Sequence, residues 1–87
     1  MMNTFRLLIS TPDGEAFNDS VMEITLRGAE GDLTIMAGHT PFITSVKKGV
    51  CKIILSDNTP KTANIDGGLL TVSKEKVVLL SGNFSWE

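Results

Sequence analysis

The sequence predicts a small all-β domain, folded as a two-sheet β-sandwich or flattened barrel of about ten short strands. Two observations lead to this prediction. All eight glycines and three prolines fall between apolar runs, where an all-β chain places its turn residues. Between these turn residues, apolar side chains recur at every second position, which is the period of a half-buried strand. Two packed sheets cover one apolar face of every such strand.

The length and composition are those of one globular domain that spans residues 1–87. Apolar residues make up 41% and charged residues 21% of the 87 positions, which argues against disorder. No apolar run approaches the roughly 20 residues of a membrane-spanning helix, so direct membrane insertion is not expected. The opening MMNTFRLLIS lacks a basic flank and a small-residue cleavage site, which favours a cytosol-like compartment.

The alternation defines the expected strands in chain order. Phe5, Leu7 and Ile9 share one face of the first strand. The segment 15–27 carries a helix-like stripe as well as a strand-like one, but its β-branched residues and its Asn-Asp-Ser run favour two short strands. The later expected faces are Met22/Ile24/Leu26, Cys51/Ile53/Leu55, Ala63/Ile65, Leu70/Val72 and Val77/Leu79. Asp66-Gly67-Gly68 is expected to be a tight turn, and residues 31–49 a connection between strands.

Several of the later strands are apolar on their second face too. The residues concerned are Val50, Ile54, Leu69, Val78 and Leu80. Only one face of each sheet can point into the core of a sandwich. Two explanations stay open: these side chains are covered by loops at the sheet edges, or one sheet keeps an apolar outer patch for a permanent partner.

The charges exclude a nucleic-acid partner. Eight Lys and Arg stand against ten Asp and Glu, for a net charge of −2. The basic residues are scattered apart from Lys47-Lys48 and the trio Lys61, Lys74 and Lys76. Such a distribution offers no continuous positive field for a polyanion.

No catalytic, metal or cofactor site is expected. Cys51, His39 and Asp32 are the residue types of a nucleophilic triad, but Cys51 is in phase with apolar neighbours and is expected to be a core residue. One His and one Cys cannot form a closed set of soft metal ligands. The paired glycines match no phosphate-binding motif.

Two non-catalytic alternatives remain besides the interpretation given below. One is a free-standing binding module. The other is a carrier domain that displays a modifiable lysine, Lys74 or Lys76, on a hairpin, although a solvated turn explains these lysines more simply.

Four ordered segments resemble one known family over the whole chain. Residues 31–49 read GDLTIMAGHTPFITSVKKG, which is similar to the GDLGILPGHAPLLT-x-L-K-x-G signature of the epsilon subunit of F-type ATP synthases. The start FRLLISTPD resembles the family's F-x-L-x-I-x-T-P-E, and Phe17 with Val21 resembles its F-x-x-x-V. GGLLTV followed by VVLL matches the family's GG-x-L-x-V and V-x-V-L.

The resemblance implies a non-catalytic central-stalk subunit that couples gamma to the c ring in proton-driven ATP synthesis. In bacteria such a subunit is peripheral on the cytoplasmic side of the cell membrane, as part of the complex. It also implies residue roles: the loop Ala29, Glu30, Gly31 and Asp32 faces the c ring, while Thr11, His39 and Thr44 lie toward gamma. Asp32 could instead stabilise its own turn, and His39 could instead cap its own loop.

The sequence departs from the family pattern in two places. Thr34, Met36 and Ala37 replace the usual Gly, Leu and Pro, which leaves the conformation of that loop to be determined. The family usually continues into a C-terminal hairpin of two helices, whereas this sequence stops at Trp86-Glu87, as a naturally short or a trimmed form would. The inhibitory and ATP-binding functions of that hairpin are therefore not carried over.

Overall fold

The computed structural model describes residues 3–87, which form seven β-strands. The strands are β1 (Phe5–Thr11), β2 (Gly14–Gly28), β3 (Gly31–Met36), β4 (Phe42–Leu55), β5 (Pro60–Val72), β6 (Lys76–Leu80) and β7 (Phe84–Trp86). The prediction of an all-β sandwich is confirmed.

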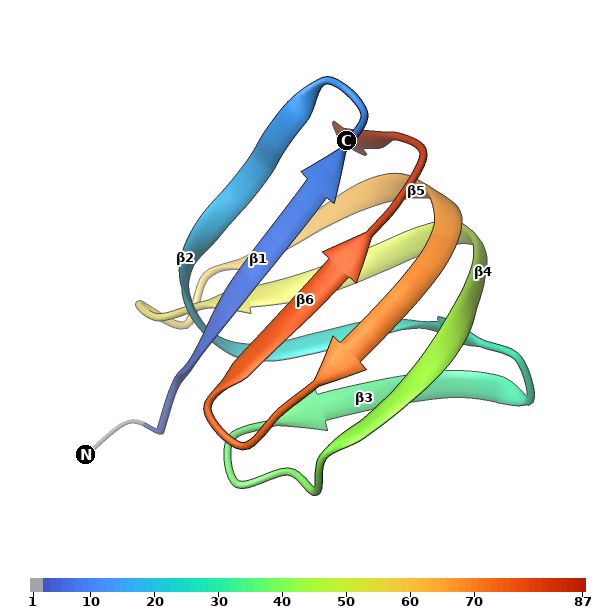
Figure 1. Cartoon of the computed structure of the whole chain (residues 1–87). Helices are drawn as coiled ribbons and strands as arrows, with labels where there is room; N and C mark the ends of the chain where they lie inside the picture. Colours follow the sequence, from blue (N-terminus) through green and yellow to red (C-terminus); the bar gives the residue numbers. More distant parts are fainter. Residues whose placement is uncertain (1–2) are drawn as a thin grey trace.

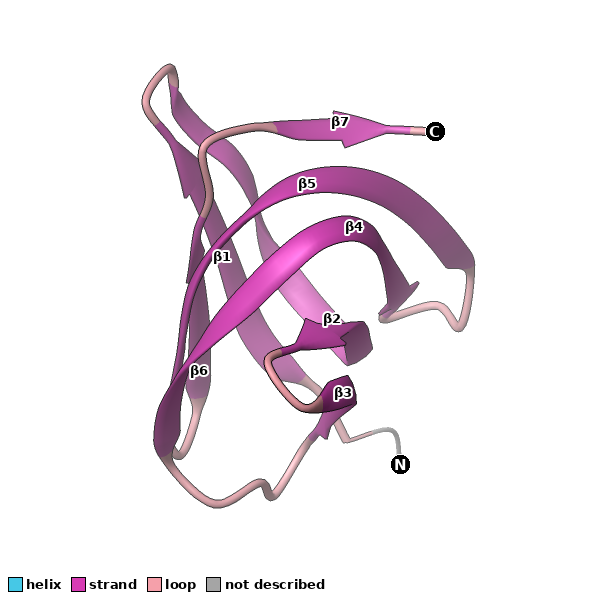
Figure 2. Ribbon diagram, turned by 90° about the vertical axis from the view of Figure 1, so that its right-hand side faces the viewer, coloured by secondary structure: helices cyan, strands magenta, loops and turns pink. Residues whose placement is uncertain are grey.

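The strands form two packed layers (Figures 1 and 2). The first layer contains β1 and β6, with residues 14–20 of β2, 42–46 of β4 and 68–72 of β5 beside them. The second layer contains β3 and β7 together with the other parts of β2, β4 and β5. In Figure 2 the two long strands β4 and β5 curve from one layer into the other.

The strand pairings close into a ring. Around the ring the order is β1-β6-β5-β4-β2, and β2 pairs again with β1. The two remaining strands are not members of the ring: β3 pairs with β2, and β7 pairs with β5. The β1–β6 pair is parallel and the other pairs are antiparallel. Closure leaves β1 and β6 without a free edge, as in a flattened barrel.

The number of continuous strands is smaller than the predicted number of about ten, because segments expected to be turns or separate strands lie inside longer strands. Asp66-Gly67-Gly68 is a bend inside β5, not a turn between two strands. Gly67 and Gly68 adopt φ of 75° and 141°, a region that side chains other than glycine rarely enter. The β5 chain therefore changes layer without losing its pairing with β4.

The segment 15–27 is also one strand instead of the two predicted. The irregular spacing of its buried apolar residues comes from a β-bulge, because the register with β4 shifts between Val21 and Glu23. Val21 and Ile24 are both buried, although they are three residues apart, and Met22 is only half-buried. The bulge explains the helix-like stripe, and Met22 was wrongly assigned to the core face.

Residues 31–49 are mostly strand, which corrects the expectation of a connection. Thr34 lies in β3, where its hydroxyl shares a hydrogen bond of 3.0 Å with the hydroxyl of Thr25 on β2. This cross-strand pair is the stabilising contact that Gly at this position would lack. The turn is confined to residues 37–41, where Gly38 has φ of 84°.

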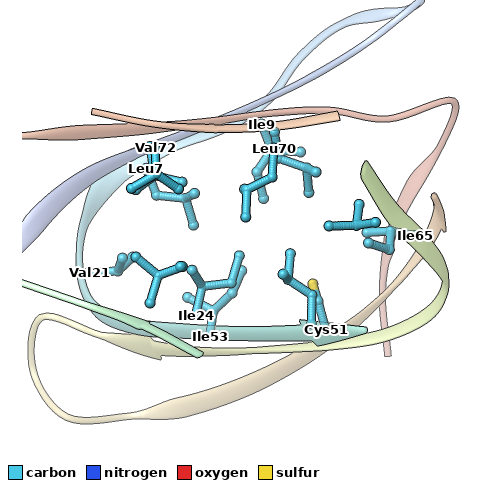
Figure 3. Close-up of a cluster of buried hydrophobic side chains, with 14 of the residues drawn as sticks. Leu7, Ile9, Val21, Ile24, Cys51, Ile53, Ile65, Leu70 and Val72 are labelled. Atoms are coloured by element: carbon cyan, nitrogen blue, oxygen red, sulfur yellow. The ribbon is translucent and has the colours of Figure 1, made fainter. Parts of the chain in front are cut away.

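The core lies between the two layers and follows the predicted alternation. Figure 3 shows Leu7, Ile9, Leu70 and Val72 from the first layer facing Val21, Ile24, Cys51 and Ile53 from the second. These side chains are all 2% exposed or less. The expectation that Cys51 is a core residue is confirmed.

Burial raises the pKa of the Cys51 thiol from 9.0 to about 11. The folded state therefore keeps the neutral thiol at a pH where the unfolded chain already ionises it. The free energy of unfolding should be unaffected by this group below about pH 9 and should fall by about 2 to 3 kcal/mol as the pH rises to 11.

This decrease can be measured by urea denaturation of the wild type and Cys51→Ala across that pH range. Other groups that titrate there cancel in the difference between the two proteins. If both lost stability equally from pH 9 to 11, the buried thiol would not be the cause.

Candidate functional site

The first layer carries an apolar patch on the side that faces away from the core. We call it the apolar outer face, and its members are Leu8, Ile43, Leu69, Val78 and Leu80. The strand register places them in two adjacent rows across the layer. One row runs Leu8, Val78, Thr71, Ile43, and the next runs Ser10, Leu80, Leu69, Ser45.

The patch is exposed, not covered by loops. Ile43 is 67%, Leu80 48% and Leu69 42% exposed, while Leu8 and Val78 are half-buried between their neighbours. Scattered apolar residues are normal on a surface, but a contiguous group across four strands indicates an interaction site. The predicted apolar outer patch is therefore present on the first layer.

The predicted set and the observed patch overlap only in part. Val50 and Ile54 belong to the second layer, so they lie on the opposite outer face. Leu8 and Ile43 were missed, although Leu8 is an apolar residue at a position where the alternation of β1 requires a polar one. Ile43 could not be found this way, because its strand was not predicted.

The loop expected to face the c ring is exposed and borders a cleft. Ala29 and Glu30 form the turn between β2 and β3, and Gly31 and Asp32 begin β3. The cleft measures about 340 Å³, and its opposite wall is Phe42, Ile43 and Thr44 at the start of β4. Glu30 and Asp32 make this rim acidic.

Thr44 therefore lies beside the loop assigned to the c ring, not with Thr11 and His39. Its partner in β5 is the buried Leu70, so its side chain points to the inner side of the layer. Its hydroxyl donates to the carbonyl oxygen of Ser45 at 3.3 Å. In this position Thr44 is half-buried at the wall of the cleft.

His39 joins three segments through its ring. One ring nitrogen, Nδ1, is 2.6 Å from the Met36 carbonyl oxygen, and Nε2 is 2.6 Å from the Ser73 carbonyl oxygen. The ring also meets Phe5 of β1 edge to face, with centroids 5.3 Å apart. Both nitrogens are occupied within the domain, an arrangement that matches the capping alternative better than a hydrogen bond to gamma.

Thr11 ends β1, far from His39. Its hydroxyl donates to the Gly14 carbonyl oxygen at 3.3 Å and accepts from the Asp13 N–H at 3.3 Å, so it stabilises the β1–β2 hairpin. Phe5, the neighbour of His39, lies six positions before Thr11 at the other end of β1, which is about 20 Å along an extended strand. The three positions assigned to gamma thus form no single cluster.

The three candidate residues of a nucleophilic triad do not lie together in the structure either. Cys51 is enclosed in the core, His39 is bonded to two carbonyl groups, and Asp32 is on the exposed start of β3. Among residues 3–87, no three His, Cys, Asp or Glu side chains gather as a metal site requires. Within the same residues no helix is long and apolar enough to span a membrane.

The two lysines of the carrier hypothesis occupy different places. Lys74 lies in the connection between β5 and β6, whereas Lys76 is the first residue of β6 and pairs with Arg6 of β1. Lys76 is thus part of the sheet and not of a displayed tip.

The comparisons with known proteins agree with the β-sandwich fold. Residues 4–87 match the family described as ATP synthase, Delta/Epsilon chain, beta-sandwich domain. The sodium ion specific ATP synthase epsilon chain of Acetobacterium woodii is 37% identical over 86 residues, which are 99% of this chain. The chain spans 65% of the length of that relative.

Two solved structures share the fold at low sequence identity. A chain of the Euglena gracilis mitochondrial ATP synthase, solved as OSCP/F1/c-ring, aligns with a TM-score of 0.89 at 20% identity over 95% of this chain and 53% of its own length. A chain of the Tetrahymena thermophila mitochondrial ATP synthase central stalk/c-ring aligns with a TM-score of 0.79 at 17% identity, over 92% of this chain and 64% of its own. With its ring of bent strands and its match over residues 4–87, the chain belongs to the delta/epsilon family of ATP synthase β-sandwich domains.

Proposed function

We propose that this domain is a non-catalytic part of the rotor of an F-type ATP synthase, where it joins the gamma subunit to the c ring. The observation that carries the proposal is the apolar outer face. A group of exposed and half-buried Leu, Ile and Val side chains across four strands is costly in water and suits a permanent interface. In this role the domain is peripheral to the membrane, on the cytoplasmic side in a bacterium.

The apolar outer face binds gamma in this proposal, and the loop from Ala29 to Asp32 faces the c ring. The acidic rim at Glu30 and Asp32 suits a basic group on the c-ring loops. The closed ring of strands suits a part that transmits torque, because a packed barrel without free edges resists shear between its layers. The arrangement supports coupling, and among residues 3–87 no group of His, Cys, Asp and Glu side chains gathers as a metal site would require.

The proposal is tested by two substitutions at the two surfaces. Leu80→Asp places a charge on the apolar outer face, next to Leu69, and should weaken binding of gamma by about 30-fold or more. Asp32→Lys should leave gamma binding unchanged and reduce co-purification with the detergent-solubilised c ring. Both side chains are exposed, so circular dichroism should find both variants folded.

Val50→Asp is the matched control, because Val50 is 50% exposed but lies on the other outer face. It should bind gamma as the wild type does. Equal binding of gamma by Leu80→Asp and the wild type would contradict the assignment of this face. A wild-type chain that bound neither gamma nor the c ring would favour the free-standing binding module.

A further inference from the structure

The apolar outer face has a basic end. Arg6 of β1 and Lys76 of β6 are direct partners in the parallel register, and both are exposed. They point to the same side as Leu8 and Val78, because residues two apart in a strand share a face. The row next to the apolar rows therefore consists of two adjacent positive charges.

The other end of the same two strands is uncharged. There the register pairs Ser10 with Leu80, the last residue of β6, and β2 places Glu15 beside Ser10. The face is thus asymmetric along β1 and β6, apolar over most of its length and cationic at one end. Lys74 in the adjacent hairpin adds to the positive charge, and Glu75 offsets part of it.

The fold itself does not account for this pair. Like charges placed opposite each other on one sheet face destabilise the pairing. Charged residues often protect free sheet edges, but β1 lies between β2 and β6, and β6 lies between β1 and β5. Arg6 donates a hydrogen bond of 3.3 Å to the side-chain oxygen of Asn18, a neutral group.

We propose that the partner of the apolar outer face places carboxylates over Arg6 and Lys76, and that this contact fixes the direction in which the partner docks. The inference rests on the proposed function, in which the partner is gamma. Apolar contact alone is non-directional, whereas a charge pair at one end favours one orientation and penalises the reverse. A rotor part that must not slip needs such a single orientation.

The test uses Lys76→Glu in the whole chain, with Lys52→Glu as the matched control. Lys52 is an exposed lysine of β4 in the second layer, so the control has the same change of charge away from the face. Affinity is measured against the purified gamma subunit of the same ATP synthase by biolayer interferometry at 50 and 300 mM NaCl.

Lys76→Glu should weaken gamma binding by about 10- to 100-fold at 50 mM NaCl and by less at 300 mM, since salt screens charges. Lys52→Glu should stay within about twofold of the wild type. In the isolated chain the new carboxylate lies opposite Arg6 and relieves the repulsion, so its melting temperature should rise by about 1 to 5 °C. Greater stability with weaker binding separates a docking role from a structural one.

The outcomes distinguish this inference from the proposed function. If Leu80→Asp abolished gamma binding while Lys76→Glu left it unchanged, the carboxylate contact would be overturned and the apolar docking would stand. If neither substitution changed binding, both the carboxylate contact and the binding of gamma by the apolar outer face would be contradicted. Restoration of Lys76→Glu binding by an Asp→Lys or Glu→Lys substitution in gamma would support the contact and identify the partner residue.

Discussion

Gly68→Ala is expected to lower the free energy of unfolding by about 4 kcal/mol or more, the largest effect of any single-methyl change in this domain. Gly68 has φ of 141°, and a Cβ there would overlap the carbonyl oxygen of Leu80 and lie 2.9 Å from its carbonyl carbon. Those atoms are backbone of β6, which is held on both sides by β1 and β5. The methyl group can therefore be accommodated only by moving a central strand.

Gly14→Ala is the matched control. Gly14 has a similar φ of 121°, but a Cβ there meets nothing within 4 Å. Its cost should be the backbone strain alone, about 1 to 3 kcal/mol. Urea denaturation of both variants measures the difference. Equal losses would mean that β6 shifts easily and that its contact with the bend in β5 does not hold the layers together.

The second large effect is expected from neighbouring residues on β5 that face opposite ways. Leu70 is fully buried between the layers, so Leu70→Ala should cost about 2 to 5 kcal/mol in the free energy of unfolding. Leu69 is 42% exposed on the apolar outer face, and Leu69→Ala should cost about 1 kcal/mol or less. A domain of this size has only about 4 to 13 kcal/mol of stability, so the first loss is a large fraction.

For association with gamma, Leu69→Ala should have the larger effect and Leu70→Ala the smaller one. Leu69→Ala removes a side chain from the proposed interface and should weaken binding by about tenfold under conditions where both variants are folded. Leu70→Ala should bind within about threefold of the wild type once its folded fraction is taken into account. Denaturation curves and gamma titrations on the same samples measure the free energy of unfolding and the affinity for gamma of each variant. A Leu69 variant that lost stability but kept its affinity would contradict the assignment of faces.

Much of the fold could be predicted from local pattern. The alternation of Phe5, Leu7 and Ile9 gave the inner face of β1 correctly, because the side-chain period of a strand is fixed by backbone geometry. The same argument placed Cys51 in the core. The family resemblance, carried mainly by residues 31–49, was confirmed by the family match.

The bends and the bulge could not be predicted in the same way. Asp66-Gly67-Gly68 is a good turn sequence, and only the continued pairing of β4 with both halves of β5 makes it a bend. The bulge at Met22 depends on the register between β2 and β4, in which Val21 pairs with Leu55 and Glu23 pairs with Ile54, residues far apart in the chain. Local propensity contains no information about such long-range pairing.

The sequence by itself determined the all-β class, the inner faces of most strands and the family. Only the tertiary structure decided which second-face residues form one surface. Leu69, Val78 and Leu80 join Leu8 and Ile43 on the first layer, while Val50 and Ile54 lie on the opposite side. The physical reason is that a side chain's face follows from its own strand, but its neighbours on that face follow from hydrogen-bonded register between segments far apart in the chain.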